Sequence, residues 1–412
     1  MKRLRFHLLG LAHLATNKKN SACAYTQKVV KLSRILKSYG HQVFFYGVEG
    51  SDLECDEFIQ VSTQDILEQA YGKYDQRKEF FKHHPQDLAH LTFNANAIKE
   101  IIARKDDQDI LLCPMGNYQQ PIAQAVNLLT VEPGIGYTGV FSSFRVFESY
   151  AWMHYVYGLL KQDDGVWYDA VIPNYFDVAD FPFEEQKEDY LLYFGRIIWR
   201  KGVQVASDVA KATGIQLYVV GQGALDNPQE GLALGGEKHI KYLPAVGPEE
   251  RARLLGKAKA VLMPTFYLEP FGGVNVEAQL CGTPVITSDW GAYPETVLHG
   301  ITWYRCRVFE EFCWAVKNIH RIRPQDCRKW AAENYSLERV GRMYEEYFQR
   351  VHRLFGRGWY ETNDKRQELE WLCRYYPQHG NGNSPSASSL SGRRPPPEAS
   401  LRETERVKTE KE

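Results

Sequence analysis

Short apolar runs and amphipathic helical segments alternate along most of this chain. The first unit is an apolar run at 4–10, a segment at 24–40 with Tyr25, Val29, Leu32, Leu36 and Tyr39 on one face, and a second run at 41–47. Such a unit predicts two parallel strands joined by a helix. A repeated βα pattern favours a parallel sheet covered by helices, so we expect an α/β fold.

The alternation occurs in two series, and this predicts two domains. Further apolar runs at 109–116, 125–134 and 168–174 extend the first series, so residues 1–180 are expected to form an N-terminal Rossmann-like domain. An acidic, proline-containing linker at 177–189 precedes the second series, which predicts a second Rossmann-like domain at 188–340. Two doubly wound domains are expected to face a central cleft, because ligands bind at the carboxyl ends of the strands in such sheets.

The C-terminal region follows a different pattern. Residues 341–376 are helical and aromatic in character and are expected to form helices that pack across the domains. From residue 377 to 412 the chain is too poor in apolar residues to bury a core, so this tail is predicted to be disordered.

Composition limits the possible classes of protein. The net charge of −1 gives no general attraction to polyanions, and the eight cysteines include no C-x-x-C pair, so they are interpreted as reduced thiols. A membrane-spanning helix needs about 20 consecutive apolar residues, and no segment of this chain has such a run. His7 and His13 also interrupt the apolar N-terminal stretch. We therefore expect a cytoplasmic protein, with peripheral membrane contact left open.

Two carboxylates lie on either side of a Pro-Phe-Gly-Gly turn in the second series. Glu269 precedes Pro270, and Glu277 lies in a short segment with helical spacing that Gly282 ends. Proline and paired glycines interrupt a helix, so Glu269 is predicted on a loop and Glu277 on the helix that follows. The arrangement is typical of a nucleotide-sugar site, and two plain surface carboxylates are the alternative.

Other short motifs of this series suggest an anion site. Gly195 and Arg196 follow one apolar run, and Lys201 precedes a helix that starts near Gly202. Arginine, lysine and a helix N-terminus all stabilise phosphates, although an exposed basic turn explains the same residues. Gly221 and Gly223 follow another apolar run, and they either let the backbone approach a ligand closely or form a plain turn. Tyr242 and Leu243 lie at a strand end, where backbone groups either contact a ligand or have no such role.

The order of these motifs resembles the retaining GT-B glycosyltransferases of the family 4 type, over residues 188–320. The resemblance implies that Arg196 and Lys201 hold the donor diphosphate. It implies that Glu269 contacts hydroxyls of the transferred sugar and Glu277 the ribose, and that backbone amides at Phe271, Gly272 and Gly273 contact the donor. Fixed positive charge suits a leaving diphosphate. The substrates implied are a UDP- or GDP-linked hexose and an acceptor. No Asp-x-Asp metal signature lies at a plausible site, so neither metal nor cofactor is expected.

The N-terminal series matches the family less well. Glu132 stands where family members carry a histidine, so it either orients the sugar or assists the acceptor hydroxyl, or it is a carboxylate without a role. His154 is a second candidate, with a structural histidine on an aromatic face as the alternative. The glycine pair that usually follows the first strand is absent, and His13 and Thr16 are the acceptor-side candidates there.

The acceptor stays open at this point. Aromatic residues crowd residues 137–157, and the first helix carries Lys28, Lys31, Arg34 and Lys37, which form either a solvated face or a site for phosphates of a lipid-linked acceptor or of nucleic acid. Segments 21–32 and 145–155 resemble phage-type glycosyltransferases, some of which glucosylate modified DNA bases. The acceptor classes are a saccharide, a lipid-linked saccharide and hydroxymethylated DNA.

A hexosyltransferase is the function that these motifs favour. The alternatives are a sugar-nucleotide epimerase of the same fold and a protein that only binds nucleotide sugars. A dehydrogenase is disfavoured because no G-x-G-x-x-G follows the first apolar run.

Overall fold

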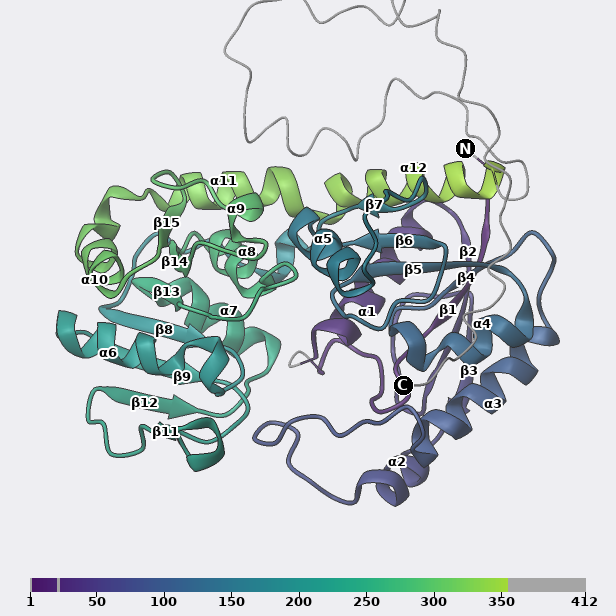
Figure 1. Cartoon of the computed structure of the whole chain (residues 1–412), viewed down its shortest axis with the longest axis horizontal. Coiled ribbons are helices and arrows are strands. Elements are labelled where there is room, and N and C mark those ends of the chain that lie inside the picture. Colours follow the sequence, from purple (N-terminus) through teal and green to yellow (C-terminus); the bar gives the residue numbers. More distant parts are fainter. Residues whose placement is uncertain (1, 21–22, 355–412) are drawn as a thin grey trace, which may run out of the picture.

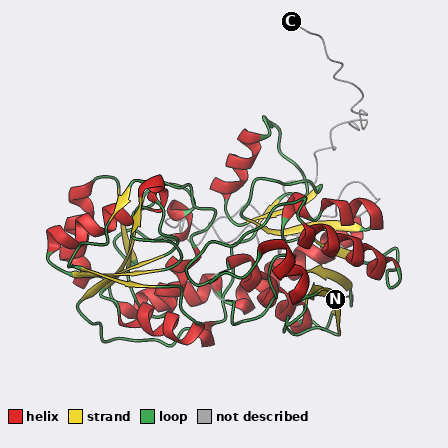
Figure 2. Ribbon diagram, turned by 90° about the horizontal axis from the view of Figure 1, so that it is seen from below, coloured by secondary structure: helices red, strands yellow, loops and turns green. Residues whose placement is uncertain are grey.

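The computed structural model describes residues 2–20 and 23–354 and shows two α/β domains side by side (Figure 1). Each domain has a parallel sheet with helices on both faces, and the two sheets are separate when the molecule is seen from below (Figure 2). The predicted pair of doubly wound domains is therefore confirmed. The predictions for residues 355–376 and for the tail at 377–412 concern residues outside those that the structure describes.

The N-terminal domain contains a seven-stranded parallel sheet. Its strand order is β3 (Glu57–Ser62), β2 (Gln42–Val48), β1 (Arg5–Leu9), β4 (Ile110–Leu112), β5 (Leu129–Ile135), β6 (Phe144–Phe147) and β7 (Ala170–Val171). The helices of this domain are α1 (Ala24–Ser38), α2 (Gln64–Tyr71), α3 (Leu88–Ile102), α4 (Gln120–Val126) and α5 (Tyr150–Leu159). Helix α1 shares one apolar cluster with the sheet, and α3 and α4 share another.

Helix α1 shows why the sequence pattern produced this layer. Val29, Leu32 and Leu36 of the predicted apolar stripe are each 1% exposed and pack on the sheet. Burying such a stripe is what stabilises an amphipathic helix in a folded domain. The helix ends where Gly40 adopts φ +77°, a conformation that glycine takes without the strain of a side chain.

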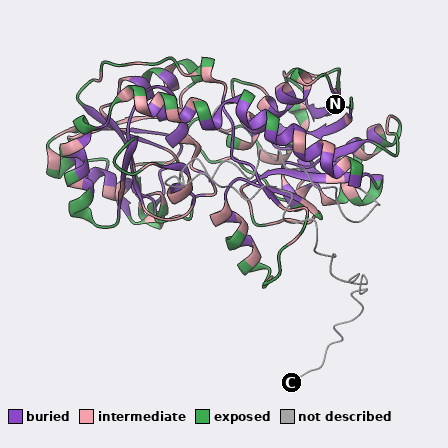
Figure 3. Ribbon diagram, turned by 90° about the horizontal axis from the view of Figure 1, so that it is seen from above, coloured by how far each residue is buried: buried purple, intermediate pink, exposed green. Residues whose placement is uncertain are grey.

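The C-terminal domain contains a six-stranded parallel sheet. Its order is β12 (Ile240–Leu243), β9 (Gln216–Val220), β8 (Tyr190–Phe194), β13 (Ala260–Met263), β14 (Val285–Ser288) and β15 (Trp303–Cys306), beside a small antiparallel pair of β10 (Asp226–Asn227) and β11 (Leu232–Ala233). The helices are α6 (Val203–Thr213), α7 (Pro248–Lys257), α8 (Gly273–Leu280), α9 (Tyr293–Thr296), α10 (Phe309–Asn318) and α11 (Pro324–Tyr335). Burial is concentrated in the strands and on the inner faces of the helices (Figure 3).

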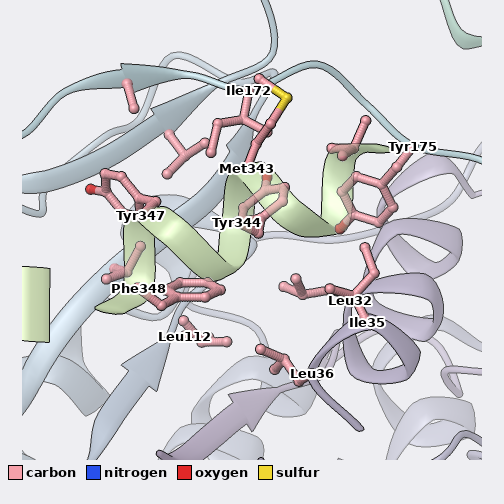
Figure 4. Packing of buried hydrophobic residues seen from close by; sticks show 14 of the residues in the cluster. Leu32, Ile35, Leu36, Leu112, Ile172, Tyr175, Met343, Tyr344, Tyr347 and Phe348 are labelled. Atoms are coloured by element: carbon pink, nitrogen blue, oxygen red, sulfur yellow. The ribbon is translucent and has the colours of Figure 1, made fainter. Parts of the chain in front are cut away.

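The last described helix returns to the N-terminal domain. The chain is extended at Ser336, which separates α11 from α12 (Leu337–Leu354), so the helix predicted to start at residue 341 begins four residues earlier. Helix α12 packs on α1, with Met343, Tyr344 and Phe348 in the same cluster as Leu32 and Leu36 (Figure 4). Phe176 forms a parallel bridge with Ser336, so the two segments that cross between the domains lie side by side.

A loop of the N-terminal domain also reaches the other domain. We call residues 72–87, between α2 and α3, the strap. Backbone carbonyls of the strap accept three hydrogen bonds from the C-terminal domain: Gln76 from the Gln222 amide (2.7 Å), Lys78 from the Gly223 N–H (2.8 Å) and Arg77 from the Ala245 N–H (2.9 Å). The strap therefore closes one end of the space between the domains.

Candidate functional site

A cavity of about 820 Å³ lies between the two domains. Most of its lining segments directly follow a strand, among them Met115 after β4, Glu148 after β6, Arg196 after β8 and Gly221 after β9. The carboxyl ends of both parallel sheets therefore open onto the same space, which is where α/β sheets bind ligands. This is the position at which the sequence predicted a cleft.

Glu269 and Lys201 form an ion pair in this cavity. Lys201 ends a short 3₁₀ turn before α6, and Glu269 lies on the loop after β13, as predicted. The side chain of Glu269 is 9% exposed and that of Lys201 is 18% exposed, so their attraction is screened less than on the surface. The Lys201 ammonium also lies 4.6 Å from the centre of the Tyr267 ring. The pair is thus held in one orientation toward the cavity.

Two glycines fix the turns that carry these groups. Gly202 has φ +77°, and a Cβ there would lie 2.0 Å from the carbonyl oxygen of Pro264. Gly221 has φ +152°, and a Cβ there would lie 1.9 Å from the carbonyl oxygen of Gly195. Because only glycine permits such close backbone contact, both turns pack directly against their neighbours.

Glu277 is paired with Arg251, a residue that the sequence did not single out. Arg251 on α7 donates from Nε to the Glu277 carboxylate on α8 at 2.6 Å, and its guanidinium lies 4.3 Å from the centre of the Phe194 ring. Both residues line the cavity. The arginine holds the carboxylate in place and leaves it capacity to accept from hydroxyl groups of a ligand.

The start of α8 faces the same cavity. Phe271, Gly272 and Gly273 all line it, and Gly272 has φ +78° as the residue that caps the helix. Free backbone N–H groups at a helix N-terminus attract anions. Gly195 and Arg196 line the cavity as well. Arg196 is exposed there and makes no ion pair with any residue that the structure describes.

Three residues predicted to contact the donor lie elsewhere. Gly223, Tyr242 and Leu243 do not line the cavity. The Gly223 N–H is used by the strap, the Tyr242 hydroxyl donates to the Gly223 carbonyl at 3.2 Å, and the Leu243 carbonyl accepts from Gly221 N–H at 3.1 Å. These groups hold the loops next to the cavity together. The residues of these loops that line the cavity are Gln222, Ala245 and Val246.

Glu132 is a structural acceptor and does not line the cavity, which corrects the prediction of a catalytic carboxylate. It lies in β5 with no exposed surface, and it accepts hydrogen bonds from the Tyr137 hydroxyl (3.0 Å) and from the N–H groups of Phe141 (2.9 Å) and Ser142 (2.7 Å). Burial raises the pKa of Glu132 to about 7, against these bonds. Its carboxylate orders the loop that follows β5.

His13 is the acceptor-side candidate that lines the cavity. Its ring is 4% exposed and lies 5.0 Å from that of His83 and 6.0 Å from that of His90, and its Nδ1 has no hydrogen-bond partner among the described residues. Burial, followed by the two neighbouring histidines, lowers the pKa of His13 to about 3. The imidazole is therefore neutral at physiological pH and available to a neutral ligand.

The other two candidates on this side lie outside the cavity. Thr16 is buried in the loop that follows β1 and does not line the cavity. His154 is exposed on α5, where its ring packs against Tyr150 and Tyr157. Sequence reasoning also missed several lining residues: Glu148, Asn174, Asn117, Tyr118 and His83. Lys28 and Lys31 were noted only as part of a basic run, yet both line the cavity.

A family comparison agrees with these positions. Residues 178–333 match the family model described as glycosyl transferases group 1. This part of the chain belongs to the glycosyl transferases group 1. It contains Arg196, Lys201, Glu269 and Glu277, and all four line the cavity.

Curated relatives match a part of the chain that is no longer than the family match. The chain is 33% identical over 151 residues to a glycogen synthase of Mycobacterium tuberculosis, which covers 33% of this chain and 36% of that protein. It is 34% identical over 125 residues to a D-inositol 3-phosphate glycosyltransferase of Mycobacterium marinum, which covers 28% of this chain and 26% of that protein. The matches thus span 36% and 26% of the length of these two relatives.

Solved structures of glycosyltransferases share the arrangement of both domains, which is the GT-B fold. One is AviGT4, a glycosyltransferase involved in avilamycin A biosynthesis, at 17% identity and a TM-score of 0.63 over 87% of this chain and 100% of that chain. Another is a sucrose-phosphate synthase of Thermosynechococcus elongatus, at 15% identity and a TM-score of 0.64 over 86% of this chain and 100% of that chain. At such identities the likeness establishes the fold.

Two further properties concern the described residues of the chain. Within 2–20 and 23–354, no helix is long and apolar enough to cross a membrane. The same part of the chain holds no group of three or more His, Cys, Asp or Glu side chains placed to bind a metal ion.

Proposed function

We propose that this protein transfers a hexose from a UDP- or GDP-linked donor to an acceptor hydroxyl, with retention of anomeric configuration and without a metal ion. One observation carries the proposal: Arg196, the Lys201–Glu269 pair, the start of α8 and Glu277 all line one cavity between the domains. This combination offers phosphate-binding groups next to carboxylates that accept from sugar hydroxyls. A solved GT-B neighbour, Anabaena HepE, holds UDP-glucose, at 14% identity and a TM-score of 0.59 over 84% of this chain and 100% of that chain.

The residues take separate roles in the proposed reaction. Arg196, Lys201 and the amides of Gly272 and Gly273 bind the diphosphate and stabilise its charge as the bond to the anomeric carbon breaks. Glu269 accepts from hydroxyls of the hexose, and Glu277 accepts from the ribose. The acceptor oxygen forms the new bond to the anomeric carbon as the bond from that carbon to the diphosphate oxygen breaks. The proton of the acceptor hydroxyl passes to the departing diphosphate, which leaves as the nucleoside diphosphate. Positive charge fixed around the leaving group favours an oxocarbenium-like transition state.

The acceptor wall is proposed to come from the N-terminal domain. Besides Lys28, Lys31 and Glu148, this wall presents histidines, aromatic rings and amides, among them His13, Tyr118 and Asn117. These groups suit sugar rings, which stack on aromatic faces and exchange hydrogen bonds with neutral partners. The proposed acceptor is a saccharide, a lipid-linked saccharide that requires peripheral membrane contact, or a hydroxymethylated base in DNA.

The test combines each radiolabelled donor with each acceptor class. The purified protein is incubated with UDP- and GDP-linked hexoses, alone and with oligosaccharides, membrane lipids or 5-hydroxymethylcytosine DNA, and label is followed into each product. We expect release of nucleoside diphosphate together with label in one acceptor class, and the anomeric configuration of the product then tests retention.

Three outcomes contradict the proposal in different ways. A changed hexose within an intact sugar nucleotide identifies an epimerase. Tight binding without turnover on any acceptor indicates a binding protein. Absence of both binding and turnover with all donors overturns the assignment of the donor site.

A further inference from the structure

The charged side chains of the cavity are incompletely paired. Its lining contains five cations and three carboxylates: Lys28, Lys31, Arg196, Lys201 and Arg251 with Glu148, Glu269 and Glu277. Each carboxylate is paired with one cation, Glu148 with Lys28, Glu269 with Lys201 and Glu277 with Arg251. Lys31 and Arg196 have no carboxylate partner among the described residues. One of them comes from each domain, and a cavity with two unneutralised cations favours an anionic ligand.

Lys31 differs from the other cations on its helix. Arg34 pairs with Asp177, Lys37 pairs with Asp56 at 2.6 Å, and neither lines the cavity. Lys28 is neutralised by Glu148 at 2.8 Å. The run of basic residues on α1 therefore divides into a paired outer part and a single free cation that faces the ligand space.

Lys31 also lies next to the segment that carries the anion-binding amides. Its ammonium donates to the Tyr175 carbonyl and lies 4.2 Å from the centre of the Phe176 ring. The same ring lies 3.5 Å from the position that a Cβ on Gly273 would occupy. Phe176 thus separates Lys31 from the first residue of α8 by the width of one aromatic ring, and all three residues line the cavity.

We propose that Lys31 binds the diphosphate of the nucleotide-sugar donor from the N-terminal domain, so that the bound donor bridges Lys31 and Arg196 across the two domains. The inference rests on the proposed function for the identity of the anion. A nucleotide sugar carries one negative charge on each phosphate, and the two free cations match that charge. The phosphate of an acceptor is the other source of such an anion, and the test separates the two.

The charge of Lys31 is sensitive to pH. Burial, first of all, lowers its pKa to about 8, with Lys28 acting in the same direction and Glu277, Asp180 and Glu148 acting against it. Lys31 is therefore protonated below pH 8 and loses its charge as the pH rises through 8. Above this pH, Lys31 must take up a proton before it can bind an anion. The affinity for the anion therefore falls as the pH rises, approaching a loss of about tenfold per pH unit.

The experiment measures binding of UDP and GDP, and of UMP and GMP, by titration calorimetry. Lys31→Gln is expected to weaken binding of the preferred diphosphate by about tenfold or more, because a charge-assisted contact to phosphate is lost. The monophosphates serve as probes with one phosphate fewer, and Lys31→Gln is expected to weaken their binding less. Lys31→Arg keeps the charge and is expected to retain affinity, and it should remove the decline between pH 7 and 9. Lys37→Gln on the same helix is the matched control and leaves affinity unchanged.

The result that overturns the inference is unchanged diphosphate affinity in a folded Lys31→Gln protein, with melting temperature as the check on folding. If the same variant then loses only the use of a phosphorylated or lipid-linked acceptor, Lys31 belongs to the acceptor instead. A flat pH profile for the unaltered protein contradicts it too. Failure of the donor-site assignment is distinguishable, since the unaltered protein would then bind none of the four nucleotides. An epimerase or a binding protein would still bind them, and the role of Lys31 could then be tested in the same way.

Discussion

The cavity wall of the C-terminal domain carries five charged side chains, including two carboxylates that each pair with a cation. The wall of the N-terminal domain carries three charged side chains, including one such pair, among histidines, aromatic rings and amides. The first wall is built from short motifs in which glycines press turns against their neighbours, as at Gly202 and Gly221. The second gathers residues from His13 to Phe176, which lie on many different segments. The difference supports the proposal that most groups acting on the sugar nucleotide belong to the C-terminal wall, and that the acceptor binds against the N-terminal wall.

The largest effect that this comparison predicts is at the Lys201–Glu269 pair. Glu269→Gln or Lys201→Met should lower turnover of the sugar nucleotide by about a hundredfold to a thousandfold, the scale seen when one group that stabilises developing charge is removed. Either change also leaves the other member of a largely buried pair uncompensated. Release of nucleoside diphosphate provides the measurement, with circular dichroism as the check on folding.

A second ion pair, which lies outside the cavity, serves as the control for this pair. Lys257 and Glu184 form an ion pair at 2.8 Å outside the cavity, and both side chains are about a third exposed. Lys257→Met is expected to leave turnover unchanged. Full turnover in Glu269→Gln would remove the basis for placing the chemistry on the C-terminal wall.

A second prediction concerns the two glycines that flank α6. Gly202 and Gly214 have nearly the same backbone conformation, with φ +77° and +71°, but only at Gly202 does a Cβ meet another atom, the Pro264 carbonyl oxygen at 2.0 Å. Gly214→Ala should lower the free energy of unfolding by about 1 kcal/mol, the strain of a left-handed residue. Gly202→Ala should cost about 3 kcal/mol, because the clash adds to that strain. Urea denaturation compares the two variants, and equal losses would show that close packing does not hold the Lys201 turn.

The smallest predicted effect tests the structural role of Glu132, which lies in the N-terminal domain outside the cavity. Glu132→Gln keeps an oxygen for the N–H groups of Phe141 and Ser142, and its amide can donate to the Tyr137 hydroxyl, so turnover and stability should change little. Glu132→Ala leaves those donors buried without a partner and should cost about 2 kcal/mol of unfolding free energy. Loss of turnover in a stable Glu132→Gln protein would contradict the structural role.

The sequence predicted the fold well because its signals are local. Apolar periodicity identified α1 and the strands that flank it, and the Pro-Phe-Gly-Gly turn correctly placed Glu269 on a loop and Glu277 on a helix. In a parallel sheet the carboxyl ends of all strands lie at one edge, so motifs that follow strands meet in space. That rule was sufficient for Arg196, Lys201, Glu269 and Glu277.

The sequence could not predict features that depend on tertiary contact. The strap binds through backbone carbonyls, which have no signature in side-chain sequence, so nothing indicated that it occupies the Gly223 N–H. Strand β5 continues through Pro133 and Gly134, and Glu132 is buried within it, where it accepts hydrogen bonds from the loop that follows. On α1, Lys31 and Lys37 have the same sequence character, and only the packing of the second domain makes one of them part of the cavity.

The return of α12 to the first domain has a consequence for the order of folding during synthesis. Domains usually fold as units, the N-terminal one first, as the chain leaves the ribosome. Here Val340, Met343, Tyr344 and Phe348 complete the same apolar cluster as Phe6 and Leu8, from the opposite end of the described chain. The N-terminal domain therefore cannot finish its core until the C-terminal domain has been made. The half of the protein that is translated first is the half that is completed last.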